Sequence, residues 1–118
     1  MSDWKPICAV DAIPRLGARR VRRARGADVA VFRAADDAVF AVLDRCPHKG
    51  GPLSRGIVFG RSVACPLHNW TIDLADGCAR APDQGCALTF AVRVDAGTVY
   101  LDAAELQGRG LETVAPAS

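Results

Sequence analysis

Two short segments of this chain each combine a cysteine with a histidine, and both residue types bind transition metals. The first segment is Cys46-Pro47-His48 and the second is Cys65-Pro66-Leu67-His68. Sixteen residues separate His48 from Cys65, and the chain contains no further histidine. Two thiolates and two imidazoles that converge at one place can hold a metal centre. The four predicted metal ligands are therefore Cys46, His48, Cys65 and His68.

Two kinds of metal centre accept this donor set. Zinc accepts two cysteines and two histidines in a tetrahedral site, but zinc sites usually pair like ligands at Cys-x(2–4)-Cys and His-x(3–5)-His spacing. Here each segment mixes one thiolate with one imidazole, which suits a two-iron cluster that takes one cysteine and one histidine from each segment. A zinc-stabilised docking module without a redox role stays as the alternative from another class.

The residues beside the predicted ligands suit loops of fixed conformation. Gly50 and Gly51 would let the backbone approach bridging sulfides closely and donate N–H groups to them. Pro52 and Pro66 would stiffen the two loops, which must stay fixed during electron transfer.

The segments around the two motifs have the pattern of short β-strands. Alternating apolar residues and turn signals predict strands over 4–10, 18–24, 28–34, 38–43, 61–64, 70–74, 88–94 and 98–102. Two of the turns, at 35–37 and 95–97, predict hairpins, and only 102–106 has a helical pattern. Many short strands with regular turns are typical of an all-β barrel or sandwich. Because each metal motif follows a predicted strand, both would lie on loops at one end of this scaffold.

Length and composition are those of one ordinary globular domain. The 118 residues are 50% hydrophobic and 24% charged, with a formal net charge of +2. That charge is too small to indicate nucleic acid or an anionic membrane as the partner. No apolar run approaches the roughly 20 residues of a membrane span, and the first residues lack the pattern of a signal peptide. We predict one domain over 1–106, a flexible tail over 107–118 and a cytoplasmic location.

Three cysteines lie outside the two metal motifs: Cys8, Cys78 and Cys86. An unpaired cysteine often packs like a small hydrophobic residue, and disulfides are rare in a reducing compartment. We expect all three to be buried free thiols.

A run of arginines precedes the first predicted hairpin. Charged side chains of this kind commonly protect the exposed edge of a sheet. The alternative is a docking patch for an acidic partner surface, whose contribution would weaken as salt rises. The run consists of Arg19, Arg20, Arg22, Arg23 and Arg25.

The pattern Cys46-x-His48-x(16)-Cys65-x-x-His68 resembles the Rieske iron–sulfur motif. The resemblance implies an all-β Rieske domain, with two loops that hold a [2Fe-2S] cluster at one end of an antiparallel barrel. It further implies that Cys46 and Cys65 ligate the buried iron and that His48 and His68 ligate the outer iron. Electrons would then enter and leave at the edge formed by the two histidines.

The residues around these motifs are similar to the small subunit of assimilatory NAD(P)H nitrite reductase. The similar segments are 48–56, 65–70 and 81–86. The resemblance implies one-electron transfer to a large subunit that carries FAD, siroheme and its own iron–sulfur cluster and reduces nitrite to ammonium. This chain lacks a dinucleotide-binding glycine-rich turn, so the substrate-reducing site would belong to the large subunit. A Rieske ferredoxin that serves a ring-hydroxylating oxygenase is the alternative, with the same cluster and a different partner.

Differences from the high-potential branch of the Rieske family predict a low reduction potential. That branch carries an extra cysteine in each loop, where this chain has Gly51 and Leu67. It also carries a serine and a tyrosine near the cluster, where this chain has Trp70 and Ile72. Because fewer hydrogen-bond donors to sulfur stabilise the reduced form less, we expect a midpoint of about −150 mV. A potentiometric titration followed by absorbance measures it, and a midpoint above zero would contradict the prediction.

Overall fold

The computed structural model describes residues 3–23, 26–46, 51–66, 70–80 and 85–108. Within them the chain forms short β-strands, two 3-10 helices and one α-helix. In chain order these are β1 (Trp4–Ala9), η1 (Val10–Ala12), β2 (Gly17–Val21), β3 (Val29–Arg33), β4 (Val39–Leu43), η2 (Leu53–Arg55), β5 (Ile57–Phe59), β6 (Ser62–Ala64), β7 (Thr71–Asp73), β8 (Thr89–Phe90), β9 (Val92–Asp95), β10 (Thr98–Asp102) and α1 (Ala103–Gly108). None of the described helices is long and apolar enough to cross a membrane.

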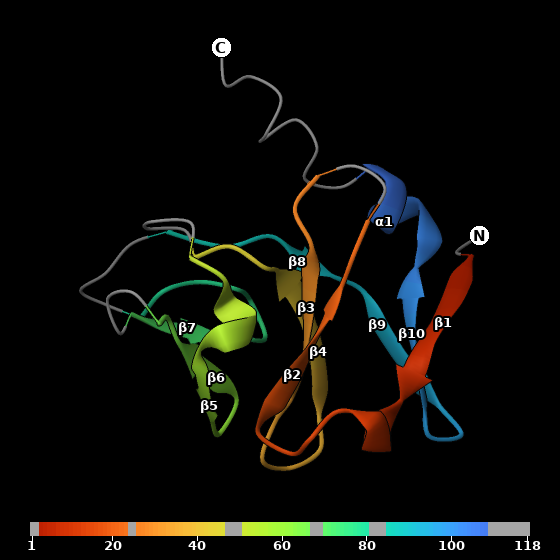
Figure 1. Ribbon diagram of the computed structural model, residues 1–118, viewed down its shortest axis with the longest axis horizontal. Helices are drawn as coiled ribbons and strands as arrows, with labels where there is room; N and C mark the ends of the chain where they lie inside the picture. Colours follow the sequence, from red (N-terminus) through yellow and green to blue (C-terminus); the bar gives the residue numbers. More distant parts are fainter. Residues whose placement is uncertain (1–2, 24–25, 47–50, 67–69, 81–84, 109–118) are drawn as a thin grey trace.

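The strands form three antiparallel sheets, so the predicted all-β fold is confirmed. The strand orders are β1-β10-β9, β2-β3-β4-β8 and β5-β6-β7. Figure 1 shows the four-stranded sheet in the centre, with β5–β7 on one side and β1, β9 and β10 on the other. Strand β2 is an edge strand of the central sheet, as the arginine run predicts.

The central strand β3 is buried on both faces and separates two hydrophobic cores. Side chains alternate between the two faces of a strand. Ala30 and Phe32 therefore point into one core, while Val29 and Val31 point into the other, and all four are fully buried. The core that contains Phe32 also contains residues of β5, β6 and β7. The second core is shared with β10 and α1.

Both predicted hairpins are confirmed. Strands β3 and β4 pair from Arg33↔Val39 onward, and β9 and β10 pair from Asp95↔Thr98. In the second turn Ala96 and Gly97 both have positive φ angles, of 50° and 79°. Two positive φ angles are typical of the tight turn that matches the twist of a hairpin.

The predicted strand over 88–94 is divided between two sheets. Strand β8 pairs with β4 in the central sheet, whereas β9 pairs with β10 in the outer one. The chain changes sheets at Ala91, whose N–H donates a hydrogen bond to Oε1 of Glu105 in α1 at 2.7 Å. The alternating pattern continues across this break, so it does not reveal the change. Strand β5 was not predicted, and α1 extends to Gly108, past the predicted domain end at residue 106. Residues 109–118 of the predicted tail lie outside the described residues.

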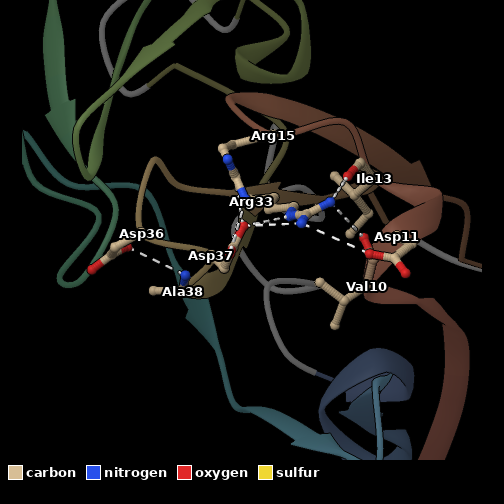
Figure 2. Close-up of polar contacts among 8 residues, drawn as sticks. All are labelled: Val10, Asp11, Ile13, Arg15, Arg33, Asp36, Asp37 and Ala38. Atoms are coloured by element: carbon tan, nitrogen blue, oxygen red, sulfur yellow. Dashed lines mark hydrogen bonds and ion pairs between the residues drawn. The ribbon is translucent and has the colours of Figure 1, made fainter.

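An arginine network fixes the turn between β3 and β4 (Figure 2). This turn lies at the other end of β4 from Cys46. The Arg33 guanidinium donates to Oδ1 of Asp37 at 3.0 Å and to the backbone oxygen of Ile13 at 2.9 Å. Arg15 donates to both carboxylate oxygens of Asp37, at 3.0 and 3.1 Å. The hydrogen bond from Arg15 has the larger effect on Asp37 and that from Arg33 a smaller one. Both hold the pKa of the Asp37 carboxyl below its ordinary value. The network joins the hairpin to the segment after β1, so it braces the scaffold and not the metal motifs.

Gly56 allows the chain between η2 and β5 to pack against β6, the strand that leads to the second metal motif. A Cβ atom at Gly56 would lie only 2.2 Å from the backbone oxygen of Ala64. Ala64 directly precedes Cys65, and η2 directly precedes Gly56. A larger residue would therefore push this part of the chain away from β6, next to Cys65.

Candidate metal centre

Cys46 and Cys65 each occupy the start of a loop that is closed by a backbone hydrogen bond. Cys46 lies three residues after the end of β4, and its N–H donates to the oxygen of Gly51 at 2.7 Å. Cys65 follows β6 directly, and its N–H donates to the oxygen of Trp70 at 2.7 Å. The positions of these two cysteines after strands agree with the sequence prediction.

The two thiols are buried in the same core. Cys46 is 3% exposed and Cys65 is 0% exposed, and neither forms a disulfide. Both pack with Leu53, Ile72 and other residues of the core that includes Phe32. A [2Fe-2S] cluster of the Rieske type takes both its cysteines on one iron. The burial of this pair fits a cluster whose cysteine-bound iron faces the core.

The predicted ligands His48 and His68 lie outside the described residues, as do Lys49 and Leu67. Among the residues that the structure does describe, no three histidine, cysteine or acidic side chains are grouped closely enough to hold a metal ion. The four-ligand set therefore stays a prediction, for which the structure supplies the positions of Cys46 and Cys65.

A buried carboxylate clamps the first loop at its base. Oδ1 of Asp44 accepts a hydrogen bond from the backbone N–H of Ser54 at 2.7 Å. Oδ2 of Asp44 accepts a second one from the Ser54 hydroxyl, also at 2.7 Å. Arg20 on β2 donates to the same carboxylate at 3.1 Å. The Asp44 side chain is only 3% exposed, and a buried charge is stable only when it is paired and hydrogen-bonded. Asp44 and Ser54 stand on either side of the loop that begins at Cys46, so this contact holds its two ends together.

Sequence analysis did not identify this clamp. Asp44 is a single acidic residue after an apolar strand, and nothing in its type indicates a partner ten positions away. Arg20 belongs to the arginine run, which the sequence presents as one uniform feature. The only available signal was an isolated acidic residue at the end of a buried strand next to a metal motif.

The arginines of the run have different roles in the structure. Arg20 pairs with Asp44 and also lies 3.7 Å from Asp28. Arg23 donates to the backbone oxygen of Ala27 at 2.7 Å and lies over the ring of Phe90, 5.4 Å from its centroid. Arg19 and Arg22 are exposed, and Arg25 lies outside the described residues.

A second polar network joins the strands on either side of the second loop. Ser62 on β6 donates its hydroxyl to Oδ1 of Asp73 on β7 at 2.9 Å. Arg80 donates to the same Asp73 oxygen at 2.9 Å and to the Ser62 hydroxyl at 2.8 Å. Trp70, between the second loop and β7, packs against the core that contains both metal-motif cysteines. The second loop is thus held by β-pairing, apolar packing and a charged group.

The prediction of three buried free thiols is wrong for two of the cysteines. Cys78 and Cys86 form a disulfide, and Cys86 is exposed to solvent. The two residues lie directly opposite one another in an isolated antiparallel bridge, so their side chains meet. Cys8 is a free thiol, as predicted, but it is only half-buried. Its burial raises the pKa of the thiol.

Comparison with known proteins identifies a family for this arrangement. Residues 3–96 match the family model of the Rieske [2Fe-2S] domain. A 3-phenylpropionate/cinnamic acid dioxygenase ferredoxin subunit from Photorhabdus laumondii is 35% identical over 105 residues, which cover 86% of this chain and 95% of that protein. A 4beta-methylsterol monooxygenase from Methylococcus capsulatus is 45% identical over 71 residues, which cover 58% of this chain but only 18% of that longer protein.

A solved structure whose name gives a different role from those of the two relatives above has the same fold. It is a Mycobacterium tuberculosis protein whose name describes a small subunit of NADH-dependent nitrite reductase, with a TM-score of 0.75 and 29% sequence identity. The match covers 86% of this chain and 95% of that chain. The similar proteins therefore include both a dioxygenase ferredoxin and a nitrite reductase subunit, and they indicate a Rieske [2Fe-2S] cluster as the cofactor.

Replacement of Asp44 by alanine should loosen the first loop. The change leaves the N–H and hydroxyl of Ser54 without their acceptor, so we expect the free energy of unfolding to fall by about 2–4 kcal/mol. We also expect less iron to be retained per chain after gel filtration. Asp36→Ala is the matched control, because the Asp36 carboxylate pairs with Arg61 on the exposed surface and such pairs contribute little. Equal urea midpoints and iron contents for the two variants would contradict the role of the clamp.

Proposed function

This chain belongs to the Rieske [2Fe-2S] family, and from that premise we propose that it transfers single electrons as the small subunit of an NAD(P)H-dependent nitrite reductase. The observation that carries the proposal is the similarity, over 86% of the chain, to a nitrite reductase small subunit of the same fold and nearly the same length. The sequence resemblance in 48–56, 65–70 and 81–86 points to the same group of proteins.

We propose Cys46, His48, Cys65 and His68 as the cluster ligands. When bound, the cluster would accept one electron from a donor and pass it to an acceptor. Histidine ligation raises the potential of such a cluster above that of an all-cysteine cluster. The burial of both cysteines and the Rieske family match support this assignment.

The loop bases would limit structural change during electron transfer. The backbone bond from Cys46 to Gly51 and the clamp between Asp44 and Ser54 fix the first loop at its two ends. The bond from Cys65 to Trp70 does the same for the second loop. Groups whose positions are fixed in advance need little rearrangement when the charge at the site changes.

A ferredoxin that serves a ring-hydroxylating oxygenase is the second candidate function. It is favoured by the 35% identity to a dioxygenase ferredoxin subunit over nearly its full length. The two candidates share the cluster, the fold and the low potential, so the identity of the partner separates them.

A basic face beside the first loop supports docking to an acidic partner. We define the basic face as Arg22, Arg45 and Arg55, which are all exposed. Arg45 and Arg55 directly follow Asp44 and Ser54, the two ends of the clamp, and η2 lies against β2, which ends just before Arg22. In the part of the chain that the structure describes, no acidic side chain pairs with these three arginines. Unpaired charges next to an electron-transfer site steer an oppositely charged partner toward it.

Reconstitution with each candidate partner tests the proposed function. Anaerobically purified chain is added to a nitrite reductase large subunit, and NAD(P)H oxidation and ammonium formation are measured with nitrite present. We expect the chain to restore nitrite-dependent NAD(P)H oxidation, and a Cys46→Ser/Cys65→Ser variant to lose most of that effect. Equal support from the variant would show that the cluster is not the route for electrons. Support of an oxygenase component instead of nitrite reduction would establish the ferredoxin function.

Charge reversal on the basic face should slow association with the partner. For Arg22→Glu/Arg55→Glu we expect an association rate constant lower by roughly tenfold or more at low ionic strength, and a smaller difference at high salt. Stopped-flow measurement of electron transfer at varied partner concentration gives this constant. Lys5→Glu/Arg93→Glu changes the net charge by the same amount and is the control, because both residues are exposed and lie in the outer sheet. An equal effect of the control would mean that only net charge matters.

A further inference from the structure

We propose that Cys78 and Cys86 form a thiol–disulfide exchange site that small dithiols or dithiol proteins reduce, separate from the predicted metal ligands. The pair is joined in the structure and lies partly at the surface, since Cys86 is exposed and Cys78 is half-buried. This differs from Cys46 and Cys65, which are enclosed in the core. The proposal concerns a second sulfur chemistry in the chain and does not depend on the nitrite reductase function.

The backbone around the pair explains why these two side chains meet. The N–H of Ala79 donates to the oxygen of Gly85 at 2.8 Å, and the N–H of Ala87 donates to the oxygen of Gly77 at 2.8 Å. These bonds flank the bridge on both sides, so the two cysteines occupy a non-hydrogen-bonded pair, where opposite side chains approach most closely. Gly77 makes the close approach possible, because a Cβ there would lie 2.3 Å from the Ala87 oxygen.

The exposure of Cys86 gives an attacking thiolate access to one sulfur of the disulfide. Exchange requires a thiolate to reach a disulfide sulfur and a leaving thiol that can depart. A buried structural disulfide lacks this access. Here solvent reaches the Cys86 side, while the Sγ atom of Cys78 lies 3.5 Å from the backbone oxygen of Asp76.

The exchange is a two-electron reaction that balances within the named reactants. One thiolate of the dithiol attacks Sγ of Cys86, the bond to Cys78 breaks, and the Cys78 sulfur leaves as a thiolate that takes up a proton. The second thiol of the reductant then displaces Cys86 from the mixed disulfide. The dithiol becomes a disulfide, and both cysteines become thiols.

The cross-link is connected to the strand beyond the second metal loop. The N–H of Asp73 on β7 donates to the oxygen of Cys78 at 2.9 Å, and the N–H of Arg80 donates to the oxygen of Thr71 at 2.9 Å. Arg80 also holds the Asp73 carboxylate. Loss of the cross-link would leave the pairing of 77–79 with 85–87 to the two hydrogen bonds that flank it, so reduction should loosen this pairing beside β7.

Differential alkylation of the cluster-containing chain tests the exchange site. Free thiols are labelled first without reductant, then with a second label after dithiothreitol under native, anaerobic conditions, and peptide mass spectrometry identifies each site. We expect Cys78 and Cys86 to carry only the second label, together, while the cluster absorbance is unchanged. The first label on both cysteines would show that no disulfide exists. A second label that appears only after denaturation would show a closed structural cross-link. Either result overturns the proposal.

Amide hydrogen exchange tests the structural consequence. On reduction we expect loss of protection at the amides of Ala79 and Ala87, and no change at Val31 in the buried strand β3. A Cys78→Ser/Cys86→Ser variant should show the same low protection with and without dithiothreitol. Unchanged protection in the reduced chain would overturn the link between the disulfide and the 77–80 segment.

Discussion

The burial of β3 on both faces is the constraint on which the rest of the fold depends. A strand with apolar side chains on both faces needs a packed layer on each side. Ala30 and Phe32 require one core, and Val29 and Val31 require the other. The first core is completed by β5–β7 and the second by the outer sheet, which explains why the chain forms three sheets. Because β4 pairs along the whole of β3, the same burial also fixes where the chain leaves the sheet toward Cys46.

Polar groups hold the loops to this apolar scaffold, and their burial makes them effective. The Asp44 carboxylate can be buried in the fold because Ser54 and Arg20 together give it three donors. In a medium of low polarity such hydrogen bonds are stronger than in water, and the loss of any one of them costs more. Apolar contacts alone would allow a loop to slide, since they have little directional preference. A carboxylate with three fixed donors allows one arrangement of the two segments that it joins.

The features that could be predicted from sequence are those set by neighbouring residues. The two hairpins follow from turn residues and alternation, and the positions of Cys46 and Cys65 after strands follow from the same reasoning. The division between β8 and β9 could not be predicted, because one alternating pattern serves two different sheets. The clamp between Asp44 and Ser54 depends on the folded path of the loop between them. The predicted ligands His48 and His68 lie outside the described residues, so their role stays a prediction.

The cysteines show why residue type and compartment are insufficient to assign sulfur chemistry. The expectation of free thiols rested on the general rarity of disulfides in a reducing compartment. Whether two cysteines face each other is decided instead by the register of the two segments that carry them. Cys78 and Cys86 are opposite in an antiparallel bridge, and they pair. Cys46 and Cys65 share one core and form no disulfide. Burial keeps these two thiols from solvent oxidants and thiolates, since exchange needs access to sulfur. One small fold can therefore hold a predicted metal-binding pair and a proposed exchangeable disulfide, because the first is buried and the second is partly exposed.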